Sequence, residues 1–248
     1  MGRSRSLKSK ARQITVYQEE IQTRGFAVVP GVLDAETIVR LTEQIERIPG
    51  SHSTKQRGHS FFGIRNLLTL APYVYELADS PSVRSIVDPV AGAQARVVRG
   101  IFFDKTPEAN WKVAWHQDLS IAVRQKKDLP GFKCWSKKAG VIHVQPPTFV
   151  LENILAVRVH LDATNELSGA LKVIPHSHRG GRLAVSDIQK LKREIQPVVC
   201  SAEKGDLLAM RPLLLHSSSA SSLASHRRVI HLEFTSIDLP GGLEWCLS

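Results

Sequence analysis

The sequence of residues 111–123 is WKVAWHQDLSIAV, and it places His116 and Asp118, two side chains that can bind a metal, inside a largely apolar run. In an extended strand, side chains two positions apart lie on the same face. His116 and Asp118 would therefore point the same way, where one metal ion could contact both. An H-x-D tripeptide alone is weak evidence, because a half-exposed His–Asp pair at a strand end has the same pattern. The segment predicts a strand, and its surroundings decide whether the pair binds a metal.

From about residue 95 onward, the chain contains short strand-like runs bounded by Gly, Pro, Asn and Asp. These runs are ARVVRGIFFDK (95–105), LAVRVHLD (155–162), GALKVIP (169–175), GDLLAMRPLLLH (205–216) and RRVIHLEF (227–234). Several short strands separated by turn residues predict a β-sandwich or barrel and argue against alternating βαβ units.

The N-terminal part has helical patterns instead. Residues 25–29 predict a short strand, and Asp34 has the position of an N-cap for the helix that follows. Apolar residues in that helix recur at intervals of three and four positions and predict one buried face, formed by Ile38, Leu41, Ile45 and Ile48.

Two further segments complete this part. Residues 51–60, SHSTKQRGHS, are expected to form a polar loop. Residues 71–92 predict two short helices that are broken at Pro81 and Pro89.

Residues 124–150 interrupt the β pattern. The segment is rich in Pro and Gly, holds Phe132 and Trp135, and carries the lysines Lys126, Lys127, Lys133, Lys137 and Lys138. A connection this long inside a compact β domain is often functional. Since it begins just after Asp118, it predicts a lid or substrate loop, with a surface excursion carrying solvated charges as the alternative.

A metal site needs a third ligand, and His216 is the best-placed candidate. It ends the most apolar strand and is followed by small polar residues, which leave room beside a metal. His160 is a rival, because alternation in VRVHLD directs it to one face together with Arg158. His176 and His178 lie in a turn flanked by Pro and Gly, where surface histidines are common.

Two His and one carboxylate leave three metal positions open, which is typical of non-haem Fe(II) oxygenases rather than zinc hydrolases, although zinc is compatible with these ligands alone. Arg227 lies eleven positions after His216 and is followed by Arg228. One of these guanidinium groups could bind the distal carboxylate of a dicarboxylate cosubstrate. Alternation favours Arg228 if the apolar face of its strand points inward, that is, the face with Ile230, Leu232 and Phe234.

In these residues the chain resembles the phytanoyl-CoA dioxygenase family of Fe(II)/2-oxoglutarate-dependent oxygenases. The resemblance begins near Tyr17, runs almost to the C-terminus, and includes FFDKTPEANWKVAWHQD, VRVHLDATNELSGALKVIPHSHRGGRL and GDLLAMRPLLLHSSSASSLASHRRVIHLEF. It places the metal ligands of the family on His116, Asp118 and His216.

The resemblance also implies a cosubstrate site. The 2-oxoglutarate arginine of the family falls on Arg227, and a serine that contacts the same molecule in relatives falls on Ser218. We follow this spacing and expect Arg227 to be the clamp. A looser match on the preceding strand adds Arg99 and Phe103.

The implied fold is mainly β, a double-stranded β-helix (a cupin-like jelly roll) with flanking N-terminal α-helices. Residues 16–248 would form one oxygenase domain, in which residues 16–94 are mostly helical support and residues 95–248 hold the β-helix. The segment 124–150 would be its lid or insert, and residues 1–15 a basic, disordered tail.

The implied activity is hydroxylation of an unactivated C–H bond. Fe(II), 2-oxoglutarate and O2 would be required, succinate and CO2 would be coproducts, and ascorbate is a candidate reductant. Asp118 argues against the related halogenases, which leave that ligand position free. The substrate would be a small organic molecule, and the lysines of residues 124–150 suggest that it is anionic. Two alternatives remain: a non-catalytic 2-oxoglutarate and metal binder acting as a scaffold or sensor, and a cupin-type metalloenzyme without 2-oxoglutarate.

Composition limits partners and location. The 248 residues carry a formal charge of +10, and three cysteines lie far apart with no C-x-x-C. We therefore expect a cytoplasmic protein without a disulfide framework. No apolar run is long enough to span a membrane, and no aromatic-interleaved basic strand predicts nucleic-acid binding. The oligomeric state is not predicted.

Overall fold

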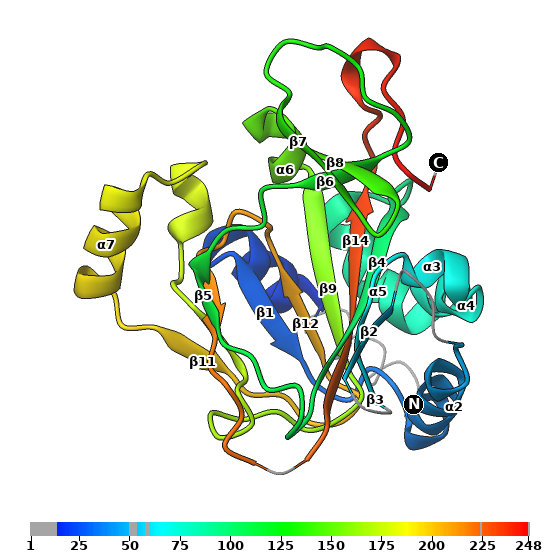
Figure 1. Cartoon of the computed structure of the whole chain (residues 1–248). Helices are drawn as coiled ribbons and strands as arrows, with labels where there is room; N and C mark the ends of the chain where they lie inside the picture. The colour runs from blue at the N-terminus through cyan, green and yellow to red at the C-terminus, as the bar shows by residue number, and fades with distance from the viewer. Residues whose placement is uncertain (1–13, 50–53, 58–59, 224, 248) are drawn as a thin grey trace, which may run out of the picture.

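A seven-stranded antiparallel sheet forms the larger wall of the molecule (Figure 1). The structure, a computed structural model, describes residues 14–49, 54–57, 60–223 and 225–247. The strands of this sheet, in spatial order, are β1 (Phe26–Val29), β12 (Leu207–Met210), β9 (Ile154–His160), β14 (Arg227–Thr235), β4 (Arg96–Lys105), β3 (Ser60–Ile64) and β2 (Thr54–Arg57). Strand β14 is central and pairs with β9 and β4 along most of its length.

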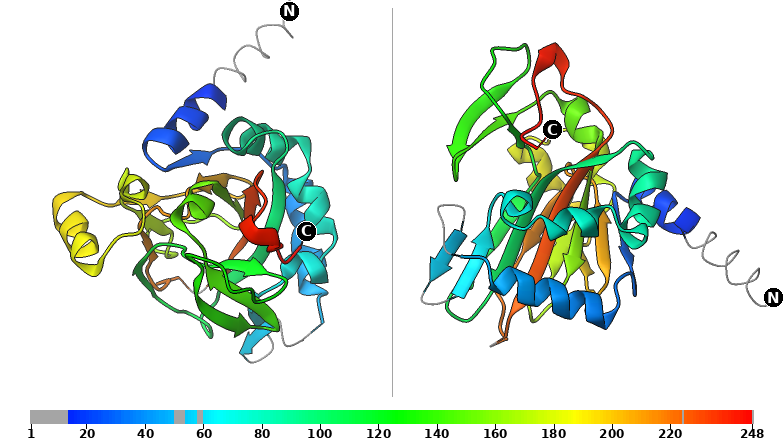
Figure 2. Two further views of the ribbon diagram at one scale, coloured as in Figure 1. Left: turned by 90° about the horizontal axis from the view of Figure 1, so that it is seen from above. Right: turned by 90° about the vertical axis from the view of Figure 1, so that its right-hand side faces the viewer.

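A smaller four-stranded antiparallel sheet faces the larger one. Its strands, in spatial order, are β11 (Val198–Cys200), β10 (Leu171–Val173), β13 (His216–Ser218) and β5 (Val113–His116). Seen from above, the two sheets enclose a common interior (Figure 2). This arrangement confirms the predicted mainly-β jelly-roll core, and it places the H-x-D segment on the wall opposite β14.

The segment 124–150 is not an irregular loop. Together with the residues just before it, it forms a third antiparallel sheet of β6 (Ile121–Val123), β8 (Val141–Gln145) and β7 (Lys133–Lys138), followed by α6 (Thr148–Glu152). In Figure 1 this sheet lies at one end of the jelly roll. Apolar side chains of the sheet and of the loop before β7, including Val144 and Phe132, belong to a buried cluster around Trp245. The segment is therefore an ordered insert.

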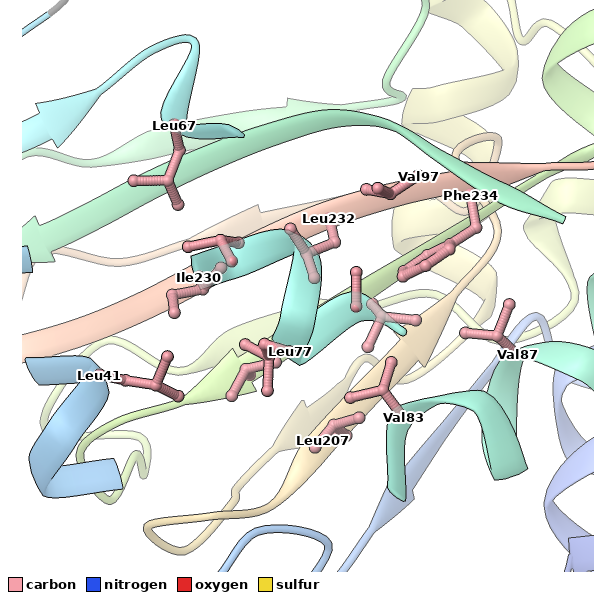
Figure 3. Close-up of a cluster of buried hydrophobic side chains, with 14 of the residues drawn as sticks. Leu41, Leu67, Leu77, Val83, Val87, Val97, Leu207, Ile230, Leu232 and Phe234 are labelled. Carbon is pink, nitrogen blue, oxygen red and sulfur yellow. The ribbon is translucent and has the colours of Figure 1, made fainter. Parts of the chain in front are cut away.

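Helices cover the outer face of the larger sheet. They are the helical residues 14–23, α2 (Ala35–Glu46), α3 (Leu67–Leu70), α4 (Tyr73–Ala78) and α5 (Pro81–Ala91). Their buried side chains pack on alternate residues of the strands, for example Leu41, Leu77 and Val83 with Leu207, Ile230, Leu232 and Phe234 (Figure 3). The main hydrophobic core thus lies between helices and sheet, outside the jelly-roll interior.

Local predictions in the N-terminal part are confirmed where capping and periodicity agree. The predicted strand is β1, and the Asp34 carboxylate accepts a hydrogen bond of 2.8 Å from the Thr37 amide at the start of α2. The predicted face of Ile38, Leu41 and Ile45 is buried.

Two local predictions are wrong. Pro89 lies inside α5 and does not break it. The helix tolerates the lost amide because Val83, Ile86 and Val87 hold it on the sheet. Residues 54–57 form β2, which pairs with β3, and not a loop. Residues 51–53, 58 and 59 of the predicted loop, and the tail up to residue 13, lie outside the described residues.

The remaining helices are short. Helix α7 (Val185–Glu194) projects beside the smaller sheet, and single 3-10 turns occur at η1 (Ser177–Gly180) and η2 (Pro240–Gly242). In the part of the chain that is described, no helix has the length and apolar character needed to cross a membrane.

Candidate metal centre and active-site cavity

His116 and His216 are direct neighbours across two paired strands. β5 ends at His116, β13 begins at His216, and the two residues are partners in the antiparallel register. Side chains of such partners project from the same face. Their imidazole centroids lie 4.2 Å apart. The sheet therefore brings together the two histidines that the sequence predicted as metal ligands.

Backbone carbonyls fix the tautomer of both rings. The Nδ1 atom of His116 lies 2.9 Å from the carbonyl oxygen of Ala114, and Nδ1 of His216 lies 2.8 Å from that of Leu214. A carbonyl can only accept a hydrogen bond, so Nδ1 carries the proton and donates. Each Nε2 is left with a free lone pair, which is the form that binds a metal.

Asp118 completes the group just beyond the end of β5. Its amide donates a hydrogen bond of 2.9 Å to the carbonyl oxygen of Pro212. Its two carboxylate oxygens lie 3.7 Å from Nε2 of His116 and 3.6 Å from Nε2 of His216. Gln117 points the other way, and its amide donates to the carbonyl oxygens of Gly181 and Leu213 at 2.8 and 2.6 Å. The expected alternation of H-x-D is observed, and the buried Gln117 anchors it.

The charge states suit a metal ligand set. Burial lowers the pKa of His216 to about 4, so this imidazole is neutral near neutral pH. Burial alone would raise the pKa of Asp118, but the imidazoles of His216 and His116 hold it well below its ordinary value. Burial lowers the pKa of His116, but the hydrogen bond to Asp118 and the charge of that carboxylate outweigh burial and hold the pKa above its ordinary value. The donor set is two imidazole nitrogens and one carboxylate, with ligand atoms all within 4.8 Å of one another. These residues fit one divalent metal ion that keeps open positions.

A cavity of about 220 Å³ lies beside this group, between the two sheets. The smaller sheet contributes the histidines, Val113, Leu171 and Ser218, and Asp118 lines it beyond the end of β5. The larger sheet contributes residues from the inner faces of β4, β9 and β14, namely Arg99, Ile101, Phe103, Arg158, Arg227, His231 and Glu233. The inner face of the larger sheet is therefore polar and basic, in contrast to its outer face.

Arg227 and Arg228 lie on opposite faces of β14. Arg227 lines the cavity and is 4% exposed, and its Nε has no hydrogen-bond partner among the described residues. Burial and the nearby Arg158 lower its pKa to about 9. Arg228 instead binds Asp162 at 2.8 Å and Glu46 at 2.9 Å. The alternation argument for Arg228 is wrong, because the apolar face of β14 packs on the helices.

Ser218 and Lys105 form a buried polar pair in the same interior. The ammonium of Lys105 donates a hydrogen bond of 2.6 Å to Oγ of Ser218, which in turn donates one of 2.9 Å to the carbonyl oxygen of Gly169. Lys105 is 0% exposed and forms no ion pair with a described residue. Burial, Arg227 and Arg158 lower its pKa to about 7.

Lys105 and Arg158 were missed by the sequence reasoning as site residues. Lys105 shares an alternation face of β4 with Arg99 and Phe103, and that pattern was a usable signal. Arg158 was noted only as a neighbour of His160, yet its guanidinium carbon lies 5.8 Å from the ring centroid of Phe103. Three buried cations in one interior need an anion to balance them.

Arg99 and Phe103 line the cavity, as the looser match required. Arg99 pairs with the buried Glu233 at 2.9 Å and donates a hydrogen bond of 3.3 Å to the carbonyl oxygen of Ser120. Phe103 contacts His231 edge-on, with ring centroids 6.3 Å apart. Both residues are placed at the site, and their contact with a cosubstrate stays a prediction.

The other histidines have different surroundings. His160 is buried, and its Nδ1 lies 3.4 Å from the carbonyl oxygen of Asp206, so it is not part of the metal-binding group. His176 and His178 contact the carbonyl oxygens of Thr23 and Gln22, at 2.7 and 3.3 Å. They connect the 3-10 turn to the N-terminal helix.

The sequence pattern of the phytanoyl-CoA dioxygenase (PhyH) family matches residues 21–229, which include every residue placed at this site. The chain belongs to the phytanoyl-CoA dioxygenase family. No sequence among the curated proteins matches it.

Solved structures share the fold of this family member. EctD from S. alaskensis, solved with 2-oxoglutarate and 5-hydroxyectoine, has a TM-score of 0.70 at 16% identity, covering 92% of this chain and 76% of its own. SnoN, an epimerase solved with Fe3+, alpha ketoglutarate and nogalamycin RO, has a TM-score of 0.65 at 18% identity, covering 94% and 92%. SnoK, a carbocyclase from nogalamycin biosynthesis, has a TM-score of 0.66 at 15% identity, covering 90% and 83%. The fold is that of the Fe/2-oxoglutarate-dependent oxygenases, and these relatives have different reactions.

A second cavity of about 240 Å³ adjoins the first in this family member. The two share Arg65, Arg99 and Ile101 as lining residues. Val141 and His143 of β8 form part of its wall. The insert therefore borders the second cavity, which is consistent with its predicted role near the substrate.

Proposed function

We propose that this protein is a non-haem Fe(II)- and 2-oxoglutarate-dependent dioxygenase that hydroxylates an unactivated C–H bond of a small organic substrate. The observation that carries the proposal is the pairing of two features in one cavity. The Nε2 atoms of His116 and His216 and the Asp118 carboxylate converge as a ligand set. Arg227 lines the same cavity, buried, with an Nε that no described residue binds.

His116, Asp118 and His216 would hold Fe(II), leaving the positions that face the cavity open. The Asp118 carboxylate would lower the net charge of the metal site. The two imidazoles, whose orientation is set by backbone carbonyls, would fix the position of the metal. When bound, Fe(II) and 2-oxoglutarate would supply the oxidising chemistry, with O2 consumed and succinate and CO2 released.

Arg227 would bind the distal carboxylate of 2-oxoglutarate. Its guanidinium presents a fork that fits a carboxylate, and its burial strengthens the contact. Ser218 and Lys105 lie on the same side and would supply a hydroxyl and an ammonium to the same dianion. The interior holds three buried basic side chains, those of Lys105, Arg158 and Arg227. Burying their positive charge costs free energy, and a bound dicarboxylate would offset that cost.

Apolar side chains would exclude water from the reacting positions. Val113, Ile101 and Leu171 line the cavity beside the polar groups. A dry site strengthens each charge contact and protects reactive species from side reactions.

Release of CO2 from carboxyl-labelled 2-oxoglutarate tests the proposal. The wild-type protein with Fe(II) and O2 should form CO2 and succinate slowly without substrate, and Asp118→Ala should form neither above background. Asp128→Ala, an exposed carboxylate in the insert, is the matched control and should match the wild type. If the wild type binds Fe(II) yet forms no succinate, the scaffold or cupin-type alternative is favoured.

A further inference from the structure

The junction of the two cavities carries an excess of positive charge. Arg65 and Arg99 line both cavities, so they stand at the opening between them. From the three-stranded sheet, His143 lines the second cavity, and Lys138 lies on the neighbouring strand β7. Two guanidinium groups and an imidazole therefore meet at one place. Lys138 lines neither cavity but lies close enough for Arg65 and Arg99 to act on its pKa.

Little negative charge opposes them. Glu233 is the carboxylate of the cavity lining besides Asp118, and it already pairs with Arg99 at 2.9 Å and with Nε2 of His231 at 3.5 Å. Arg65 forms no ion pair with any residue of the described ranges, and residues 50–64 before it contain no Asp or Glu.

The basic groups also act on one another. Burial and then Arg99 lower the pKa of Arg65, and burial followed by Arg65 and Arg99 lowers the pKa of Lys138. Burial and then Arg99 lower the pKa of His143 to about 4, so this imidazole is neutral near neutral pH. Such crowding of cations is relieved by a bound anion.

Away from these groups, the lining of the second cavity is mostly apolar, with Asn66 and Thr69 as the polar residues. Its wall includes Leu70, Val98, Ile101, Ala122, Val141 and Leu247. A ligand that fits both parts has an anionic group and an apolar body. No lysine of the insert lines this cavity, and Lys138 is connected to it through its charge interaction with Arg65 and Arg99.

We propose that the substrate is an amphipathic anion, whose carboxylate or phosphate monoester binds Arg65 and Lys138 at the junction while its apolar body occupies the second cavity. This rests on the proposed function for the reaction, but the anion site itself exists without it. Arg99, held by Glu233, would orient the anion and keep it apart from the 2-oxoglutarate clamp at Arg227.

Calorimetric titration with octanoate, octyl phosphate and the neutral octanamide tests the site. The protein is used metal-free and also loaded anaerobically with Fe(II) and 2-oxoglutarate. An anionic probe should bind about tenfold more tightly than octanamide, as one charge-assisted contact provides. The tighter of octanoate and octyl phosphate identifies which oxyanion the site prefers.

Variants locate the binding. Arg65→Met and Lys138→Met should each weaken the anionic probe about tenfold and leave octanamide unchanged. Lys137→Met, on the same exposed strand, is the matched control and should behave as the wild type. Because Lys138 is exposed, its variant remains informative even if Arg65→Met does not fold.

Three results would overturn the proposal: no preference for the anionic probes, equal loss in Lys137→Met and Lys138→Met, or loss of 2-oxoglutarate binding in place of probe binding in Arg65→Met. Binding of the probes by the metal-free protein separates this question from the oxygenase activity. If the protein bound the anionic probes but did not turn over 2-oxoglutarate, the anion site would be supported and the proposed oxygenase reaction would be contradicted.

Discussion

At the residue scale, Arg227 and Arg228 show that a binding residue is identified by the face of the strand that lines the cavity. Alternation separates the two side chains but does not say which face is inside. Arg227 lines the cavity, and its Nε has no hydrogen-bond partner among the described residues, whereas Arg228 is bound to Asp162 and Glu46. Arg227→Ala should weaken 2-oxoglutarate binding about a hundredfold, because a buried charged contact is lost.

Arg228→Ala is the matched control for that measurement. It removes an ion pair on the outer face and should lower the free energy of unfolding by about 1 kcal/mol with little effect on 2-oxoglutarate affinity. Calorimetry and urea unfolding on both variants separate the effects. The reverse assignment would follow if Arg228→Ala were the variant that loses the cosubstrate.

Lys105 makes stability depend on pH. Its pKa is lowered to about 7 in the folded state, whereas an unfolded lysine keeps its ordinary pKa near 10.5. Between these values the unfolded chain holds more protons, so the free energy of unfolding should rise with pH. Below pH 7 both states are protonated, and the folded state carries the full cost of the buried ammonium.

Lys105→Met should remove this rise. Urea unfolding from pH 7 to pH 10, without metal or 2-oxoglutarate, should show a wild-type slope that the variant lacks, with a total difference on the order of a few kcal/mol. Lys112→Met, at an exposed position, is the control and should keep the slope. Parallel curves for wild type and Lys105→Met would show that Lys105 titrates as an ordinary lysine.

At the element scale, the sequence predicted strands well where turn residues bound them and failed where tertiary packing overrode a local signal. Pro89 was expected to end a helix, yet packing of α5 on the sheet retains it. The polar residues 54–57 were expected to be a loop, yet they pair with β3, since an edge hairpin tolerates polar side chains.

The cluster of His116, Asp118 and His216 was predictable because H-x-D alternation is local and the third histidine ends a strongly apolar strand. The inner surface of the larger sheet was not. On β14, Ile230, Leu232 and Phe234 pack with the helices, whereas Arg227, His231 and Glu233 line the cavity, as Arg158 does from β9. Single-strand patterns cannot show which face a helix layer covers, so Lys105 and Arg158 were missed.

The ordered insert allows a test of its role at the second cavity. Val141→Trp should fill this cavity and reduce binding of the octyl probes, and later of the substrate, while 2-oxoglutarate decarboxylation without substrate continues. Lys133→Trp, exposed on β7, is the control. If Val141→Trp lost probe binding and 2-oxoglutarate decarboxylation to the same extent, the substitution would have disrupted the metal centre or the folding of the protein.

At the scale of the whole molecule, stability and chemistry occupy opposite faces of one sheet. The outer face carries the core with the helices, including Leu232, which is 0% exposed (Figure 3). Leu232→Ala should lower the free energy of unfolding by about 2–5 kcal/mol through the cavity it leaves. The folded protein should retain its affinity for 2-oxoglutarate. Urea unfolding measures the loss of stability, and calorimetry measures the affinity.

His231→Ala, on the adjacent inner position of β14, is the opposite case. His231 lines the cavity beside Glu233. Its removal should therefore change the 2-oxoglutarate affinity more than the free energy of unfolding. If Leu232→Ala and His231→Ala changed stability and affinity alike, the two faces would not be functionally separate.

In the proposed function, His116, Asp118 and His216 hold Fe(II) with 2-oxoglutarate bound beside it. Anaerobic titration of the Fe(II)-loaded protein with 2-oxoglutarate tests it most directly, through the weak visible metal-to-ligand charge-transfer band of keto-acid chelation. The band should appear in the wild type and be lost in Asp118→Ala. An iron-loaded wild-type protein that shows no band, or an undiminished band in Asp118→Ala, would contradict the claim.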